Sequence, residues 1–169
     1  MAHPLVNQLR FTRKEFQRGL KNLSEADAQK RLGPMNSISW IIAHMAWHEQ
    51  LYWLTRAQGI LLVPEVREQA NGAPASTPSL AYAWKSWKAI TAASDAWLDT
   101  LTSKKLTKHL TQEDGTEYRE SIGSYLLRVR HHYWYHLGES QAIRQMLGHT
   151  GLASYVGDQH GKAPYAPED

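Results

Sequence analysis

The chain has 169 residues, no cysteine, and a formal net charge of +3 spread over 19 basic and 16 acidic side chains. The lack of cysteine excludes disulfides, thiolate metal ligands and a cysteine nucleophile, so any metal site must use histidine and carboxylate ligands. The basic residues are spread along the chain, which argues against a nucleic-acid-binding surface. No apolar run reaches the ~18 residues of a membrane span, and the N-terminus lacks the apolar core of a signal peptide. We therefore expect a cytoplasmic protein.

Four long segments repeat apolar residues at helical spacing, and no segment alternates for long enough to form a large sheet. The helices are expected at residues 4–23, 36–59, 79–101 and 121–148. A short helical extension capped by Ser24 follows the first. Gly123 and Gly138 interrupt the fourth helix, and we expect a neighbouring segment to approach closely at both.

The connections between these helices differ in length. Residues 60–78 contain three prolines and could span about 60 Å when extended, so the second and third helices can run parallel through a crossover. A small hairpin is expected around Asp114 and Gly115. The sequence therefore predicts an all-α four-helix bundle over residues 1–148, with an irregular tail at 149–169 that packs on the bundle or extends from it.

Two pairs of histidines occupy the second and fourth helices. His44 and His48 are four residues apart, as are His132 and His136, so each pair lies on one helix face. An unpaired imidazole is costly on an apolar face, and one metal ion would satisfy several rings at once. Three of these rings can converge across a bundle. His48 lies one position off the apolar stripe, which favours a place beside such a site over a ligand.

The other histidines show no such pairing. His131 is expected to point away from His132 toward the surface. The remaining four lack a partner pattern and are expected to be solvated: His3, His109, His149 and His160.

The histidine-bearing segments resemble the DinB-like superfamily. The similar stretches are residues 37–46, and residues 121–127 leading to a His-x-x-x-His-x-Gly sequence that begins at His132. The similarity spans roughly residues 5–148. The resemblance implies a crossover bundle, and members of the family often form homodimers. It also implies one divalent metal ion, zinc or nickel, held by His44, His132 and His136.

Three neutral imidazoles leave a fourth metal position for water or a thiol, as in catalytic sites. Several members of the family are similar to transferases or isomerases that use a low-molecular-weight thiol. We therefore expect a metal-dependent transferase, hydrolase or isomerase that acts with a small thiol. Side chains expected beside the ion or in the pocket wall are His48, Glu139, Trp40, Trp47 and Tyr133, and the acids considered as proton carriers are Glu49, Glu139 and Asp95.

Two other interpretations remain open. One is a non-catalytic dimeric bundle with a structural or stress-related metal site. The other is a di-iron bundle, which is disfavoured because the first and third helices offer no inward carboxylate. In a homodimer, the first and third helices and the hairpin around Gly115 are the expected contacts.

Overall fold

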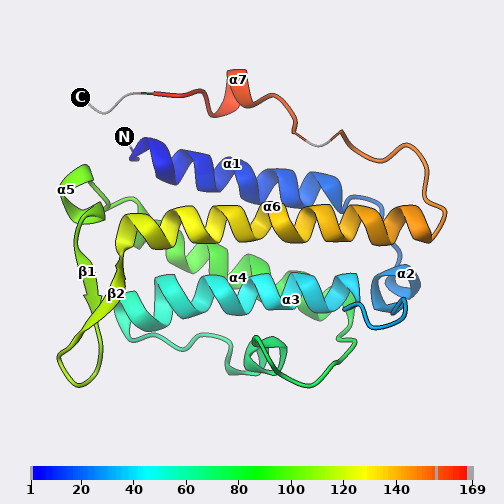
Figure 1. Ribbon diagram of the computed structural model, residues 1–169, viewed down its shortest axis with the longest axis horizontal. Helices are drawn as coiled ribbons and strands as arrows, with labels where there is room; N and C mark the ends of the chain where they lie inside the picture. Colours follow the sequence, from blue (N-terminus) through cyan, green and yellow to red (C-terminus); the bar gives the residue numbers. More distant parts are fainter. Residues whose placement is uncertain (1, 155, 167–169) are drawn as a thin grey trace.

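The computed structural model describes residues 2–154 and 156–166. Its main body is a bundle of four long helices, namely α1 (Pro4–Gly19), α3 (Ile38–Glu49), α4 (Leu80–Leu98) and α6 (Ile122–Met146). Helix α1 packs on α6, and α3 packs on both α4 and α6 (Figure 1). The predicted all-α bundle is confirmed. No helix of the described ranges combines the length and apolarity needed to cross a membrane.

The predicted crossover is also confirmed. Helices α3 and α4 run in the same direction, opposite to α1 and α6 (Figure 1). Residues 60–79 connect them by running back along the length of the bundle (Figure 1). This segment contains a short 3-10 helix, η2 (Pro64–Gln69). The buried amide of Gln50 fixes its start, since Nε2 donates to the Val63 carbonyl and Oε1 accepts from the Leu62 and Val63 N–H groups at 2.7–3.0 Å.

Serine caps fix the starts of three of the four long helices. Ser37, Ser79 and Ser121 each accept a hydrogen bond from the backbone N–H three residues later, at the starts of α3, α4 and α6. Ser24 does the same for the small helix α2 (Glu25–Gln29). These starts agree with the sequence pattern because capping is a local property of the chain.

Some helix ends and forms differ from the prediction. Helix α1 ends at Gly19 because Gln141 and Arg144 of α6 donate to the Gly19 carbonyl at 2.8 and 2.6 Å, so the chain turns away. After Glu49 the second long helix continues as a π-helix, η1 (Gln50–Arg56). Apolar periodicity does not distinguish these helix types. Short π segments are common beside functional sites.

A two-stranded hairpin connects α4 to α6. After the short helix α5 (Ser103–Leu106), strands β1 (His109–Thr111) and β2 (Glu117–Ser121) pair antiparallel, as expected. A Cβ added at Gly123 would lie 3.1 Å from the Leu106 carbonyl oxygen, so the predicted close approach is found there. At Gly138 the prediction is wrong, because an added Cβ would face open space.

The described part of the C-terminal tail returns along α1 and includes the short helix α7 (Gln159–Lys162) (Figure 1). The carboxylate of Glu15 accepts from the Gly157 N–H at 2.7 Å, and Arg18 donates to the Ser154 carbonyl at 2.6 Å. Glu15 is therefore a buried carboxylate of α1, although it lies under the tail and outside the bundle interior. Positions 155 and 167–169 of the predicted tail lie outside the described residues.

A buried ion pair joins the helices of the bundle. Arg13 of α1 donates hydrogen bonds of 2.7 Å to both carboxylate oxygens of Glu49 on α3. Tyr133 of α6 donates to the same carboxylate at 2.8 Å and accepts from Trp87 Nε1 of α4 at 2.7 Å. Burial alone would lower the pKa of Arg13, but Glu49 holds that pKa above its usual value. All four helices therefore meet at one polar network.

Replacing Glu49 with glutamine should lower the free energy of unfolding by about 3 kcal/mol, because the guanidinium of Arg13 then stays buried without its charged partner. Urea denaturation of parent and variant measures this difference. The control is Asp99→Asn, which removes an exposed partner of Arg10 and should leave stability nearly unchanged. Equal losses in both variants would show that the buried pair has no special role.

Candidate metal centre

Three imidazoles converge between α3 and α6. Nε2 of His132 lies 3.3 Å from Nε2 of His44 and 2.9 Å from Nε2 of His136, and the candidate ligand atoms of all three lie within 4.8 Å of one another. His44 and His136 are buried, and His132 is partly buried. Nitrogens bound to one tetrahedral zinc ion would be about 3.3 Å apart. The arrangement therefore has the dimensions of a three-histidine metal site.

Hydrogen bonds behind two of the rings orient their lone pairs. Nδ1 of His44 lies 2.6 Å from the backbone carbonyl of Gln69, which can only accept, so Nδ1 carries the proton and Nε2 is left with a lone pair. Nδ1 of His136 lies 2.8 Å from the Glu139 carboxylate, with the same consequence. Of the three Nε2 atoms, only that of His132 can therefore carry a proton and donate a hydrogen bond to its neighbours. A cation at their centre would satisfy all three lone pairs.

Burial keeps the rings of His44, His132 and the neighbouring His48 neutral. Burial, reinforced by the neighbouring imidazole of His136, lowers the pKa of His44 to about 4 and that of His132 to about 3. Burial and the same cluster lower the pKa of His48 to about 2. At pH 7 the rings of His44 and His132 are therefore ready to bind a cation without first losing a proton.

Aromatic and imidazole rings surround His44. Trp40 stacks on it at 4.6 Å between ring centroids and 11° between planes, and Trp47 stacks at 5.3 Å and 30°. The ring of His48 lies 4.2 Å from that of His132, and its buried Nδ1 has no hydrogen-bond partner among the described residues. Trp40, Trp47 and His48 thus lie beside the three converging rings.

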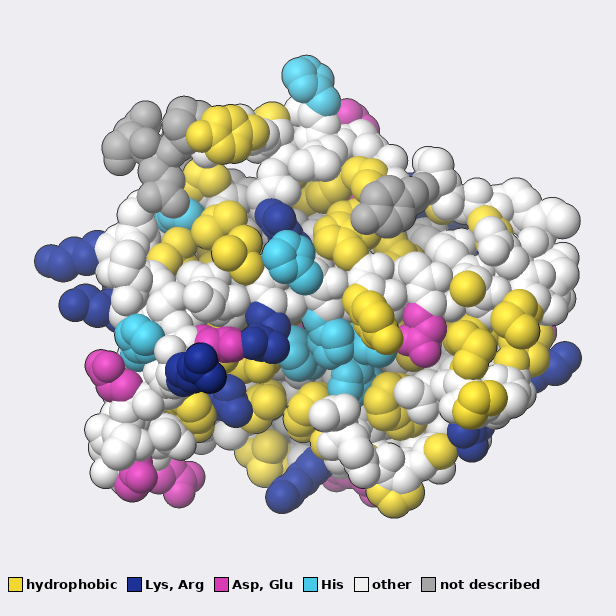
Figure 2. Space-filling model, in the orientation of Figure 1, with side chains coloured by type: hydrophobic (Ala, Val, Ile, Leu, Met, Phe, Trp, Pro, Cys, Tyr) yellow, Lys and Arg dark blue, Asp and Glu magenta, His cyan; other side chains and the backbone are white. Residues whose placement is uncertain are grey.

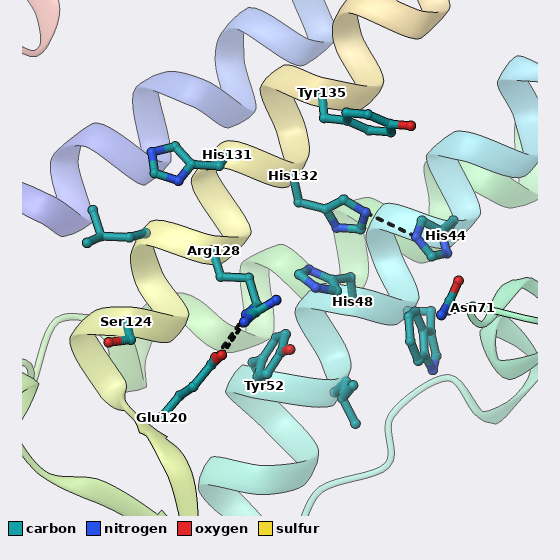
Figure 3. A pocket seen from close by; sticks show the side chains of 13 residues that line it. His44, His48, Tyr52, Asn71, Glu120, Ser124, Arg128, His131, His132 and Tyr135 are labelled. Carbon is teal, nitrogen blue, oxygen red and sulfur yellow. Dashed lines mark hydrogen bonds and ion pairs between the residues drawn. The ribbon is translucent and has the colours of Figure 1, made fainter.

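A pocket of about 780 Å³ opens next to the imidazoles. His44, Trp47 and His48 of α3 line one side, and Arg128 and His132 of α6 line the other (Figure 3). The space-filling view shows histidine side chains gathered at the surface in the middle of this face (Figure 2). A small molecule in the pocket would therefore lie against two of the three rings.

Comparison with known proteins places this architecture in a family. The sequence model of the DinB superfamily matches residues 8–140 of this chain. The chain belongs to the DinB superfamily. A similar solved structure is that of a conserved protein from Enterococcus faecalis, with a TM-score of 0.56 and 16% identity over 86% of this chain and 96% of that one, which shows a shared fold. A comparison with curated proteins finds no match.

Within the described ranges of this DinB chain, the grouping that could hold a metal contains three histidines and no carboxylate ligand. A di-iron centre needs several bridging carboxylates. The structure therefore offers no support for the di-iron interpretation. It also shows Glu139 behind His136, as expected for a residue beside the site.

Three predictions about neighbouring side chains are wrong. Tyr133 does not line the pocket, because one step along α6 from His132 turns its side chain by about 100° into the Arg13–Glu49 network. Glu49 and Asp95 are not free to carry protons at the site, since Arg13 binds both carboxylates. Among the three acids considered, Glu139 alone contacts a converging histidine.

The isolated histidines divide into two groups. His131 and His160 are exposed, as expected. His3 is buried and accepts from a backbone N–H as the cap of α1, His109 contacts a carbonyl of β2, and His149 lies between an arginine of α6 and an aspartate of α2. The expected solvation of these three is therefore wrong, because His3 is buried and the rings of His109 and His149 are partly buried and hydrogen-bonded.

Two features of the site have no signal in the sequence. The Gln69 carbonyl reaches His44 only through the path of the crossover, and because it is a backbone group its contact is not marked by a residue type. The ion pair of Arg128 and Glu120 at the far end of the pocket depends on how β2 enters α6. Both contacts require the folded arrangement to be known.

The metal-free protein should lose stability as the pH falls from about 6.5 toward 4. In this window unfolded histidines bind protons, whereas the pKa of His48 in the folded state is about 2, so protons favour unfolding. His48→Gln should make this loss shallower, as measured by thermal unfolding in EDTA at a series of pH values. His160→Gln, which changes an exposed ring, should retain the parent slope. Parallel curves for parent and His48→Gln would contradict the argument.

Proposed function

We propose that this DinB protein binds one divalent metal ion, zinc or nickel, through Nε2 of His44, His132 and His136. We further propose that it uses this ion to activate a small thiol or water against a small-molecule substrate in the adjacent pocket. The observation that carries the proposal is the convergence of three Nε2 atoms, two of which have lone pairs fixed by hydrogen bonds at Nδ1.

The fourth coordination position of the proposed metal ion supports a catalytic role of the ion over a purely structural one. Three imidazoles provide three of the four ligands of a tetrahedral ion, and no carboxylate joins their set in the described residues. His44 and His132 both line the pocket, so the uncovered side of the set faces its interior. A divalent ion held there lowers the pKa of a bound water or thiol and supplies a nucleophile near neutral pH.

The chain's own groups have distinct tasks in this scheme. The Gln69 carbonyl and the Glu139 carboxylate hold the imidazoles of His44 and His136 in the orientation that binds metal. Trp47 and Tyr52 provide apolar wall for the substrate. The carboxylate of Glu139 is also the nearest acid that can share a proton with a ligand ring.

Purified protein should contain about one divalent metal ion per chain by elemental analysis, because the three rings can form one site. His44→Ala, His132→Ala and His136→Ala should each lose most of this metal, whereas His48→Ala should retain it. Glu139→Gln should weaken metal affinity by about 10-fold through the loss of ring orientation. His131→Ala is the matched control, since it removes an exposed ring of the same helix.

Metal retained at the parent level in His132→Ala would contradict the assignment. A non-catalytic site is the other candidate, and the close approach of His48 to His132 gives it one specific support, a fourth imidazole within reach. In that case His48→Ala would also lose metal and the loaded protein would bind no thiol. Retention of metal by His48→Ala together with thiol binding favours the catalytic role.

We also propose that the chain forms a homodimer, through the first and third long helices and the hairpin around Gly115. Exposed Ile60, Leu61 and Leu62 add apolar surface that a second copy could cover. Sedimentation should therefore give a species of twice the 19.3 kDa chain mass at micromolar concentration. A single 19.3 kDa species over that range would refute the dimer.

A further inference from the structure

The pocket beside the three histidines ends in an ion pair. Arg128 of α6 lines it, four residues before His132 and thus one turn away on the same helix face. Its Nε donates to Glu120 Oε2 at 2.8 Å, and its Nη2 donates to the other oxygen of the same carboxylate. These are the two charged side chains among the described residues that line the pocket, apart from histidine.

Glu120 occupies one edge of the guanidinium and leaves another free. Nη1 of Arg128 has no hydrogen-bond partner among the described residues, and the Arg128 side chain is 53% exposed. Figure 3 shows a nitrogen of Arg128 turned away from Glu120 toward His48. Arg128, His48 and His132 line the same pocket, so the guanidinium charge lies near both rings. Free N–H groups therefore face the inside of the pocket.

The charge of the loaded pocket favours an anion. Glu120 and Arg128 form an ion pair, so they cancel in formal charge. The proposed ion then adds two positive charges at one end, while the free guanidinium edge offers directed donors at the other. Guanidinium hydrogen bonds to carboxylates are among the stronger ones in proteins. A neutral group at the arginine end would gain less from the guanidinium charge than a carboxylate, and a cationic group would be repelled by it.

We infer that Arg128 binds the carboxylate of a small thiol ligand whose sulfur lies at the three-histidine end of the pocket. The inference rests on the proposed function and names the chemical class that the same site would bind. Arg128 and His132 are separated by a rise of about 6 Å along the axis of α6, a spacing on the scale of a short mercaptocarboxylate. The apolar surfaces of Trp47 and Leu127 lie beside the pocket and suit the methylene groups between sulfur and carboxylate.

The test compares three thiols of equal length on the cobalt-substituted protein: 3-mercaptopropionate, 3-mercapto-1-propanol and 3-mercaptopropylamine. Thiolate-to-cobalt charge-transfer absorption reports their dissociation constants after the metal content of each sample has been measured. In the parent protein, 3-mercaptopropionate should bind at least about 10-fold more tightly than the neutral alcohol, and the amine should bind most weakly.

Arg128→Gln should remove most of the advantage of 3-mercaptopropionate and leave the neutral thiol unchanged. Arg128→Lys should keep part of that advantage, because the charge remains while the paired N–H geometry is lost. Arg130→Gln is the matched control, since it removes the charge of an arginine of α6 that does not line this pocket, and it should behave as the parent.

The outcomes separate the two proposals. If the parent protein binds no metal, the proposed function fails and this inference fails with it. If metal and the neutral thiol bind but the carboxylate gives no advantage, the inference alone is overturned. The inference is also overturned if Arg128→Gln weakens the neutral thiol and the mercaptocarboxylate equally, or if Arg130→Gln has the effect of Arg128→Gln.

Discussion

The carboxylate of Glu49 lies fully buried at the centre of the bundle, where Arg13 and Tyr133 donate hydrogen bonds to it. A buried charge must keep its partners, so the helices that supply these groups have little freedom to slide. Glu49 directly follows His48, and Tyr133 directly follows His132. The network that joins the helices therefore also sets the depth at which the histidines of α3 and α6 face each other.

Local features of the fold could be predicted, and tertiary ones could not. The starts of α3, α4 and α6 follow from Ser37, Ser79 and Ser121, because a cap involves atoms only three residues apart. The early end of α1 depends on a contact between distant segments, and the π-helical form of η1 has no counterpart in the apolar pattern. Hydrophobic periodicity contains no information about such contacts.

The same division applies to the site. The spacing of His44, His132 and His136 indicates that three rings can converge, since helical register is a local property. The error at Tyr133 has the same origin: an aromatic residue next to a histidine suggests a pocket wall, although its side chain points about 100° away. Arg128 has no signal in the sequence because its role depends on the pocket around it.

The contact between His44 and the crossover is made by a peptide carbonyl. That oxygen belongs to the backbone, and the buried Gln69 side chain, which donates to Ser76 Oγ at 3.2 Å, helps to hold this stretch in place. The contact also depends on the length of the chain. The Gln50 amide fixes one end of the segment and the short helix η2 leads to the other, so inserting or deleting a residue between positions 63 and 69 would move the carbonyl away from the ring. In this protein, the spacing of the crossover is itself a determinant of the imidazole tautomer.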